Sequence, residues 1–240
     1  MERIALISDI HANMPALEVV LADIKHRGIN RVMCLGDLAG KGANPKEAVE
    51  IIRNTCEVVI KGNWDYLISE VNDCDFLWWN STRLHGEQLE YLRNLPMYFE
   101  FYMSGKLIRL CHASPKNVFD RVQSIAPIEE KLRLFEAPDD NSSECDVLIY
   151  ADIHVSYMQN FRQKTIVNLG SVGVPLKVSK ASYGIIEGEY GSKEEASLLI
   201  SLVTVPYDIE RAIKEAEKAG VPDLDKYSYE LRTGEIYNPD

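Results

Sequence analysis

Residues 3–35 constrain the fold more than any other part of the chain. Arg3 to Ser8 is a short, mostly apolar run of the kind that forms a buried parallel strand. Apolar side chains then recur at helical spacing until Gly28, at Leu17, Val20, Leu21 and Ile24. A second apolar run follows from Arg31 to Leu35. A strand, a helix and a second strand in this order predict a βαβ unit with a right-handed crossover.

The rest of the 240-residue chain continues to alternate between helical and strand-like patterns. Helices are expected over Pro45–Arg53, most of Asp65–Leu95, Ile128–Glu136 and Asp208–Ala219. Strands are expected over Glu57–Ile60, Met97–Met103, Lys106–Cys111, Asp146–Tyr150, Tyr157–Phe161, Thr165–Leu169, Ser182–Ile186 and Ser197–Val205. From Pro222 onward we expect one or two helical turns and then fraying. Because the sequence has no repeat and no long linker, it predicts a single α/β domain over residues 1–240.

Charge and hydropathy exclude several classes of protein. The net charge of −11 argues against a broad nucleic-acid-binding face, which needs clustered Lys and Arg, but it leaves room for a small anionic substrate. No apolar run approaches the length of a membrane span, and Met1 leads directly into a short strand rather than a signal peptide. We therefore expect a cytoplasmic protein that binds neither membranes nor nucleic acids stably. The sequence leaves a homo-oligomer open.

The cysteines do not form a pattern of their own. The chain has five, an odd number, and they are scattered without a Cys-x-x-Cys motif, which disfavours a disulfide framework or a zinc ribbon. Cys34, Cys111 and Cys145 lie in or beside apolar strand patterns and are expected to be small buried hydrophobic residues.

Polar side chains with metal-binding groups follow several of the expected strands. Asp9 and His11 come directly after the first, and in an extended chain they point to the same side, separated by roughly 6.6 Å. Taken alone, this pair is explained at least as well by Asp9 as a helix cap and His11 as a surface residue as by a metal site. Comparable residues follow later strands, at Asp37, Asn63, His112, Asp152 and His154. Because sites collect at the carboxyl ends of strands in α/β sheets, the pattern predicts a dinuclear metal centre there.

Short motifs follow one another along the chain in a fixed order: Asp9-x-His11, Gly36-Asp37, Gly62-Asn63, His112 and x-x-His154. Two turns accompany them, Gly40-x-Gly42-x-x-Pro45 and Asn168-x-Gly170-Ser171-Val172-Gly173-x-Pro175. The motifs resemble the blocks of the calcineurin-like metallophosphoesterases. The turns resemble the smaller prokaryotic branch, which includes phosphodiesterases and dinucleoside polyphosphate hydrolases. The resemblance spans about residues 3–187 and implies a four-layer sandwich, in which two facing mixed β-sheets are flanked by helices.

The resemblance also implies a set of metal ligands. Asp9, His11 and His154 would hold the first metal ion, and Asp37 would bridge both ions. Asn63 and His112 would hold the second ion, together with residue 152. Six of the seven positions carry the residue expected from the family. Mn or Fe is favoured for the two divalent or trivalent ions, and Zn, Ni and Mg remain alternatives.

Two positions depart from the family pattern. Asp152 stands where the family usually has a histidine; a carboxylate can still coordinate and would favour harder ions. Trp64 follows Asn63 where many members have a histidine that protonates the leaving group, and an indole donates only through its N–H. His85 is the candidate for supplying that proton, and a surface role is the alternative for it. His26 is expected to be solvated near a helix end.

The leading hypothesis is a metal-dependent phosphoesterase acting on a small phosphorylated molecule, with nucleotides or dinucleoside polyphosphates favoured. Hydroxide that bridges the two metals would attack phosphorus in line, with Asp37, Asn63 and His85 as the catalytic side chains. A protein phosphatase is the weaker alternative, because the Val-Asp-Arg-Gly continuation of that subgroup is absent after Gly36-Asp37. A catalytically weak or inactive metal-binding scaffold on the same fold is the third hypothesis.

Several other residues close to the motifs have ordinary structural explanations. Lys41 and Lys116 sit in loops where they would reach distant phosphates, but surface solubility explains them better. Trp64, Tyr66 and Phe119 would stack on a base, although core or rim packing is the commoner role of such aromatics. Ser171 is expected to support the site within a tight turn rather than act as a nucleophile, because no histidine lies near it in the sequence.

Overall fold

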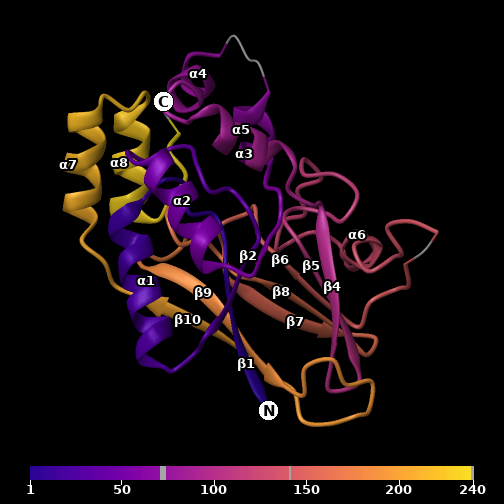
Figure 1. Cartoon of the computed structure of the whole chain (residues 1–240). Coiled ribbons are helices and arrows are strands. Elements are labelled where there is room, and N and C mark those ends of the chain that lie inside the picture. The colour runs from indigo at the N-terminus through magenta and orange to yellow at the C-terminus, as the bar shows by residue number, and fades with distance from the viewer. Residues whose placement is uncertain (71–73, 141, 239–240) are drawn as a thin grey trace.

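Two five-stranded sheets lie face to face, and helices cover their outer sides (Figure 1). We describe a computed structural model, in which residues 1–70, 74–140 and 142–238 are placed. The first sheet has the order β10-β9-β1-β2-β3 and the second the order β4-β5-β6-β8-β7. This arrangement confirms the expected sandwich of two mixed sheets flanked by helices.

The first sheet contains the expected βαβ unit. Its strands are β1 (Glu2–Ile7), β2 (Arg31–Cys34), β3 (Val58–Val59), β9 (Ala181–Gly188) and β10 (Leu199–Val205). Strands β1, β2 and β3 run parallel, so their carboxyl ends lie at one edge, while β9 pairs antiparallel with β1 and with β10. The helix α1 (Met14–His26) connects β1 to β2, and the side chain of Asn13 caps it by accepting a hydrogen bond from the Ala16 amide.

The second sheet begins with the predicted hairpin. Its strands are β4 (Tyr98–Met103), β5 (Lys106–Cys111), β6 (Val147–Tyr150), β7 (Tyr157–Phe161) and β8 (Lys164–Asn168). Strands β4 and β5 pair antiparallel, whereas β5, β6 and β8 run parallel. The carboxyl ends of β5 and β6 therefore also meet at one edge of their sheet.

Alternation along the strands builds the layers. On β1, Ile4 and Leu6 pack into the core between the two sheets, whereas Ala5 and Ile7 pack on the helix side. On β6, Val147 and Ile149 enter the same inter-sheet core, and Leu148 and Tyr150 pack on the opposite face. Because successive side chains of a strand point to opposite faces, a strand that is buried on both faces is apolar throughout.

The remaining helices pack around the sheets. They are α2 (Pro45–Thr55), α3 (Asn63–Ser69), α4 (Asp75–Ser81), α5 (Gly86–Arg93), α6 (Ile128–Arg133), α7 (Ile209–Ala219) and α8 (Leu224–Thr233). The helical stretch expected over residues 65–95 is divided into α3, α4 and α5, and residues 71–73 lie outside the described part of the chain. None of the helices in the described ranges is long and apolar enough to cross a lipid bilayer.

The C-terminal segment is more ordered than its sequence predicts. The expected helix is present but is longer than one or two turns, because α8 extends over ten residues. Tyr227 and Leu231 anchor it in a core cluster with α7, from which Ala212 and Ile213 contribute. Helices α7 and α8 lie side by side at the end of the molecule that also carries α3 and α4 (Figure 1).

Candidate metal centre

The predicted ligands follow strand ends of both sheets and lie close together. Asp9 follows β1, Asp37 follows β2, and Asn63 begins α3 directly after β3. His112 follows β5, and Asp152 and His154 follow β6. The site therefore lies where the parallel strands of the two facing sheets end, as expected for α/β architectures.

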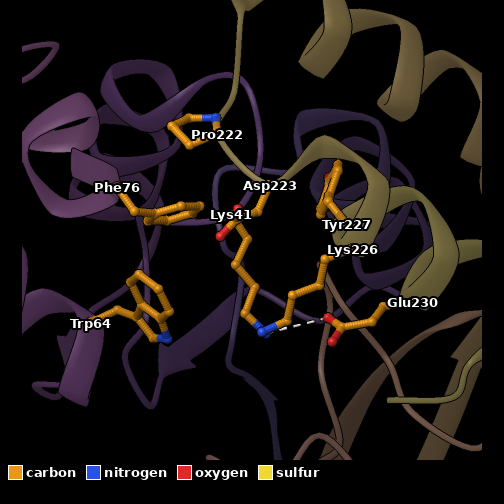
Figure 2. A pocket seen from close by; sticks show the side chains of 8 residues that line it. All are labelled: Lys41, Trp64, Phe76, Pro222, Asp223, Lys226, Tyr227 and Glu230. Atoms are coloured by element: carbon orange, nitrogen blue, oxygen red, sulfur yellow. Dashed lines mark ion pairs between the residues drawn. The ribbon is translucent and has the colours of Figure 1, made fainter. Parts of the chain in front are cut away.

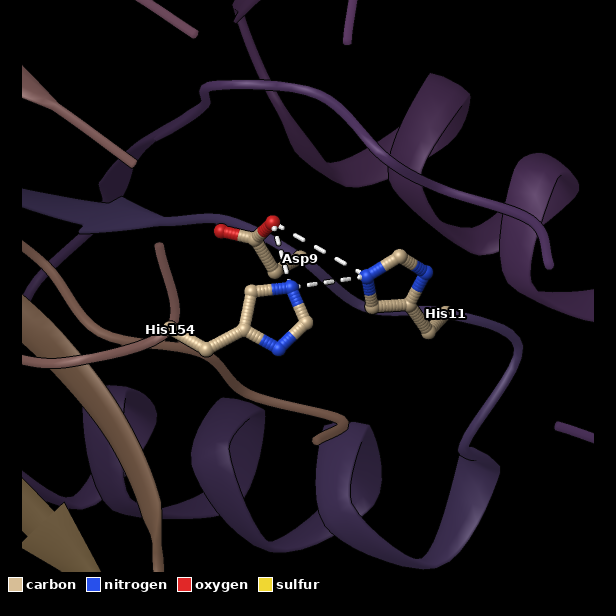
Figure 3. A group of neighbouring side chains, drawn as sticks. All are labelled: Asp9, His11 and His154. Atoms are coloured by element: carbon tan, nitrogen blue, oxygen red, sulfur yellow. Dashed lines mark hydrogen bonds and ion pairs between the residues drawn. The ribbon is translucent and has the colours of Figure 1, made fainter. Parts of the chain in front are cut away.

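Asp9, His11 and His154 form the first group of ligand atoms (Figure 3). The Asp9 Oδ1 atom lies 3.2 Å from His154 Nε2 and 3.8 Å from His11 Nε2, and the two Nε2 atoms are 3.1 Å apart. All three side chains are buried. Their converging Nε2 and carboxylate atoms have the donor types and the spacing of a metal site.

Asp9, Asp37 and His112 form the second group. The Nε2 atom of His112 lies 3.4 Å from Asp37 Oδ2, 3.9 Å from Asp9 Oδ1 and 3.0 Å from Asn63 Oδ1. Asp37 Oδ2 is also 3.6 Å from His11 Nε2, so this one oxygen is within reach of both groups. That is the position a bridging carboxylate needs.

The buried polar atoms fit metal ions. Among the described residues, neither carboxylate oxygen of Asp9 has a hydrogen-bond partner, and Asp37 Oδ2 has none either. Burying such oxygens unpaired is costly unless a cation balances them. The other ring nitrogens of the histidines are already held, since His112 Nδ1 contacts the Leu35 carbonyl at 2.7 Å and His154 Nδ1 contacts the Val174 carbonyl at 2.6 Å. Both Nε2 atoms therefore point into the cluster, His112 Nε2 toward Asn63 Oδ1 at 3.0 Å and His154 Nε2 toward His11 Nε2 at 3.1 Å, where a metal ion would bind them.

Burial and neighbouring charges shift the pKa values of the cluster in opposite directions. Burial would lower the pKa of His112, but the carboxylates of Asp37, Asp9 and Asp152 outweigh it and raise this pKa to about 10. Burial lowers the pKa of His11 well below its usual value, with the Lys41 charge adding to the effect. For Asp9, burial raises the pKa, yet the interactions with His154 and His112 leave it below the ordinary value.

The backbone at the ligands is held in an uncommon conformation. Residues with φ between 47° and 66° include five of the predicted ligands, namely Asp9, His11, Asp37, Asp152 and His154. For residues other than glycine this left-handed region is sparsely populated and costs on the order of 1–3 kcal/mol each. Such conformations cluster at functional sites because the surrounding structure enforces them.

Asp65 and Gly62 hold the Asp37 loop in place. The Asp65 carboxylate accepts hydrogen bonds from the backbone amides of Asp37 at 2.7 Å, Leu38 at 2.9 Å and Gly62 at 2.9 Å. Asp37 Oδ1 in turn accepts a bond from the Trp64 amide at 2.8 Å, which leaves Oδ2 free to face the histidines. A Cβ atom on Gly62 would overlap Asp37 Oδ1, so the close approach of these two loops requires glycine.

The turn after β8 holds the backbone of Asp9 in place through a hydrogen bond. The Ser171 hydroxyl is buried, donates to the Asp9 carbonyl at 2.9 Å and accepts from the Val174 amide at 2.8 Å. Its hydrogen bonds thus agree with a supporting role within the turn. Asn13 adds a second tie, because its side-chain amide donates to the Gly173 carbonyl at 2.7 Å.

Asp152 differs from the other ligand candidates because it already has a strong partner. Its Oδ1 atom lies 4.0 Å from His112 Nε2, close to the second group. Arg121, however, binds both of its oxygens at 2.8 Å through Nε and Nη2. Arg121 lies in the irregular segment between β5 and α6, where no periodic pattern marks it, and sequence reasoning did not single it out. The one sequence feature that relates Arg121 to the site is its position nine residues after His112.

The structure does not bring His85 to the metal ligands. His85 is exposed at the N-cap of α5 and is absent from the side chains that line the cleft over the ligands. Lys116 is exposed as expected, and Tyr66 and Phe119, both exposed, contact each other edge to face with ring centroids 5.6 Å apart. Lys41 is not a simple surface residue, since its side chain is only 21% exposed and lines that cleft.

Comparisons with known proteins agree with this geometry. A family model described as the calcineurin-like phosphoesterase superfamily domain matches residues 2–191. An uncharacterised protein of Methanocaldococcus jannaschii is 34% identical over 238 residues, which cover 92% of this chain and 94% of that protein.

Two solved structures show the same fold. A hypothetical protein from Pyrococcus horikoshii OT3 superposes with a TM-score of 0.80 at 23% identity, covering 99% of this chain and 100% of that chain. A metallophosphoesterase from Sphaerobacter thermophilus superposes with a TM-score of 0.76 at 24% identity, covering 98% of this chain and 99% of that chain. Together with the family match, the motif order and the two groups of ligand atoms place this chain in the calcineurin-like phosphoesterase superfamily.

Proposed function

We propose that the protein is a metal-dependent hydrolase of a phosphodiester or phosphoanhydride bond in a small molecule. The observation that carries this proposal is the buried Asp37 Oδ2 atom, which has no hydrogen-bond partner among the described residues and lies 3.6 Å from His11 Nε2 and 3.4 Å from His112 Nε2. A carboxylate within reach of two groups of ligand atoms is suited to hold two ions close enough to act on one phosphate.

The residues divide between two ions as the family pattern implies. Asp9, His11 and His154 would hold the first, with Asp37 contributing to both. His112, Asn63 and Asp152 would hold the second. When bound, such ions supply Lewis-acid activation of a water molecule and neutralise phosphate charge. The oxygen-rich donor set, three carboxylates and one amide beside three histidines, favours Mn or Fe over softer ions.

The cleft over the ligands is suited to a phosphate that carries further negative charge. It measures about 430 Å³, and its lining includes Arg121, Lys41, Lys177 and Lys226. Guanidinium and ammonium groups bind phosphate oxygens through charge-assisted hydrogen bonds. Four cationic side chains against the three carboxylates of the same lining, Asp37, Asp152 and Glu230, in a chain with a net charge of −11, support an anionic substrate.

The groups available for proton transfer narrow the substrate class further. Trp64 stands where the resemblance implies a histidine that protonates the leaving group, and His85 is not among the residues that line the cleft. A phosphate leaving group is already stable as an anion and needs little help from a general acid. This favours phosphoanhydrides, such as nucleotides and dinucleoside polyphosphates, over esters of poorly acidic alcohols.

A turnover assay with a matched variant tests the proposal. The protein would be assayed with Mn²⁺ on bis-p-nitrophenyl phosphate, p-nitrophenyl phosphate and a dinucleoside tetraphosphate, beside an Asp37→Asn variant. The asparagine side chain would keep an oxygen to accept from the Trp64 amide, so the loop keeps its hydrogen bond while the bridging charge is lost. We expect metal-dependent turnover that falls at least 100-fold in the variant, in the range for a catalytic group.

Two outcomes would count against an enzyme. Turnover that does not depend on metal, or that is equal in the variant, would remove the assigned role of Asp37. Absence of turnover on all three substrates, with metal bound, would instead favour a scaffold that acts by contact. The Arg121–Asp152 pair, which occupies both oxygens of one ligand candidate, is the feature that keeps this second function open.

A further inference from the structure

A second hollow opens beside the metal ligands, between α3, α4 and the C-terminal helix α8 (Figure 2). It measures about 170 Å³. Lys41, Trp64, Lys226 and Glu230 line both this hollow and the larger cleft over the ligands, so the two spaces adjoin. We call it the α8 pocket. A molecule with one phosphate at the metal ligands would therefore extend into the α8 pocket.

One wall of the α8 pocket is aromatic. The Trp64 ring contacts the ring of the ligand His11 edge to face, with centroids 5.9 Å apart, and contacts Phe76 with centroids 5.2 Å apart. Gly40 lies against the indole so closely that a Cβ atom there would come within 2.9 Å of its Cε3 atom. These contacts hold the indole in place, and it lines the pocket together with Phe76 and with Tyr227 of α8.

The pocket lining carries two lysines, Lys41 and Lys226, and two carboxylates, Asp223 and Glu230. Lys41 Nζ lies 3.7 Å from Glu230 Oε2. Lys226 has no carboxylate within 4.0 Å among the residues that the structure describes, and Asp223 forms no ion pair with either lysine. Burial lowers the pKa of Lys41, and the Lys226 charge lowers it further against the opposing effect of the Glu230 carboxylate; both lysines line the pocket. A bound anion would relieve their repulsion.

We propose that the α8 pocket binds the organic part of the substrate, a planar aromatic ring against Trp64 and Phe76 with an additional anionic group at Lys41 and Lys226. This inference rests on the proposed function and narrows its substrates to nucleotide-like phosphates. Aromatic side chains bind any base by stacking on its π-face. Trp64, next to the ligand candidate Asn63 in the sequence, is the stacking surface in this proposal. Helix α8 closes the pocket, and so the C-terminal segment sets substrate choice.

Isothermal titration with two non-hydrolysable probes tests the inference on the metal-loaded protein. One probe is α,β-methylene-ADP, and the other is methylenediphosphonate, which has the same phosphonate groups without the nucleoside. We expect the nucleotide analogue to bind at least tenfold more tightly. Phe76→Ala should weaken it about tenfold and leave methylenediphosphonate unchanged, because one stacking partner is lost. Phe76 is chosen over Trp64 because the Trp64 ring contacts the ligand His11, whereas the ring contact of Phe76 is with Trp64.

Two further variants distinguish binding of the aromatic ring from binding of the anionic groups. Lys226→Gln, at an exposed position, should weaken both probes about threefold to tenfold. Trp78→Ala, on the same helix as Phe76 but exposed and away from the pocket, should change neither. Equal binding of the two probes, or an equal effect of Phe76→Ala on both, would overturn the inference.

The outcome also distinguishes this inference from the proposed function. Discrimination between the probes without metal-dependent turnover would leave a nucleotide-binding protein and remove only the enzyme. Metal-dependent turnover that is lost in Asp37→Asn, with no discrimination between the probes, would leave the enzyme and remove only the ring-binding role of the α8 pocket.

Discussion

Arg121 binds both carboxylate oxygens of Asp152 at 2.8 Å, and the Oδ1 atom of the same carboxylate lies 4.0 Å from Nε2 of the ligand candidate His112. A bidentate pair of this kind fixes the orientation of the carboxylate, and each oxygen keeps a lone pair that a metal ion can use. The same pair offsets part of the negative charge that would attract the second ion. Arg121 is half-exposed, with 52% of its side-chain surface accessible, so substrate can reach it as well.

Removing the Arg121 charge should strengthen the second metal site. We expect Arg121→Gln to raise the affinity for the second Mn²⁺ ion about fivefold, because a nearby positive charge is lost. Isothermal titration with Mn²⁺ would measure both sites. Arg133→Gln, the same change of residue on the neighbouring helix α6, should leave both affinities unchanged. A weaker second site in Arg121→Gln would instead mean that the pair mainly holds Asp152 in position to coordinate.

Substitutions of Asp152 itself should separate coordination from charge balance. Asp152→Ala removes the donor and is expected to lower the second-site affinity about tenfold or more and to reduce turnover. Asp152→His restores the residue that the family usually has and should retain two ions, with a relative gain for Zn²⁺ over Mn²⁺. Metal content after dialysis, measured by elemental analysis, would check both. Two ions per chain in Asp152→Ala would show that Asp152 is not a ligand.

Metal binding should release a proton near neutral pH. The neighbouring carboxylates, acting against burial, raise the pKa of His112 to about 10, so the imidazole is protonated at pH 7 before a metal arrives. A histidine ligand must be neutral, and so the metal has to displace that proton. The apparent affinity should therefore rise with pH below this pKa, by up to about tenfold per pH unit.

Titrations in two buffers with different ionisation enthalpies would count the released protons. We expect close to one proton from His112 at pH 7, and less in His112→Asn, which keeps an oxygen donor without a titrating ring. An affinity that is independent of pH between 6 and 8 would contradict the assigned charge of His112.

Asp65 should be important for stability although it is buried and does not line the cleft over the ligand candidates. Asp65→Ala leaves three buried backbone amides, those of Asp37, Leu38 and Gly62, without their acceptor. We expect the free energy of unfolding to fall by about 3 kcal/mol or more, as measured by urea denaturation. Glu87→Ala removes an exposed acidic residue from the first turn of α5 and should change stability by less than about 0.5 kcal/mol. Similar losses in both variants would contradict this account.

Much of the site could be predicted because its ligands lie next to strong local patterns. Asp9 and Asp37 directly follow apolar parallel strands, and His112 follows a hairpin whose turn at Ser104-Gly105 is evident in the sequence. Because parallel strands bring their carboxyl ends together, motifs that follow successive strands in the sequence come close together in the fold. The positions of these ligands depend on backbone pattern more than on details of packing.

The residues that sequence reasoning missed depend on long-range contacts. Arg121 lies in an irregular segment, and its partner is 31 residues away. The environment of Lys41 depends on Glu230 of α8, a helix whose length was underestimated because Tyr227 and Leu231 are stabilised by a distant cluster rather than by local propensity. Contacts of this kind leave no periodic signal in the sequence.

The left-handed backbone at the ligand candidates limits which residues these positions of the chain tolerate. Asp9, His11, Asp37, Asp152 and His154 all adopt positive φ. Asn, Asp, His and Gly tolerate this conformation best, whereas β-branched residues do not. Of these four, three also coordinate metals. At these positions the main-chain geometry therefore disfavours β-branched replacements, and aspartate at position 152 combines tolerance of this conformation with the ability to coordinate a metal.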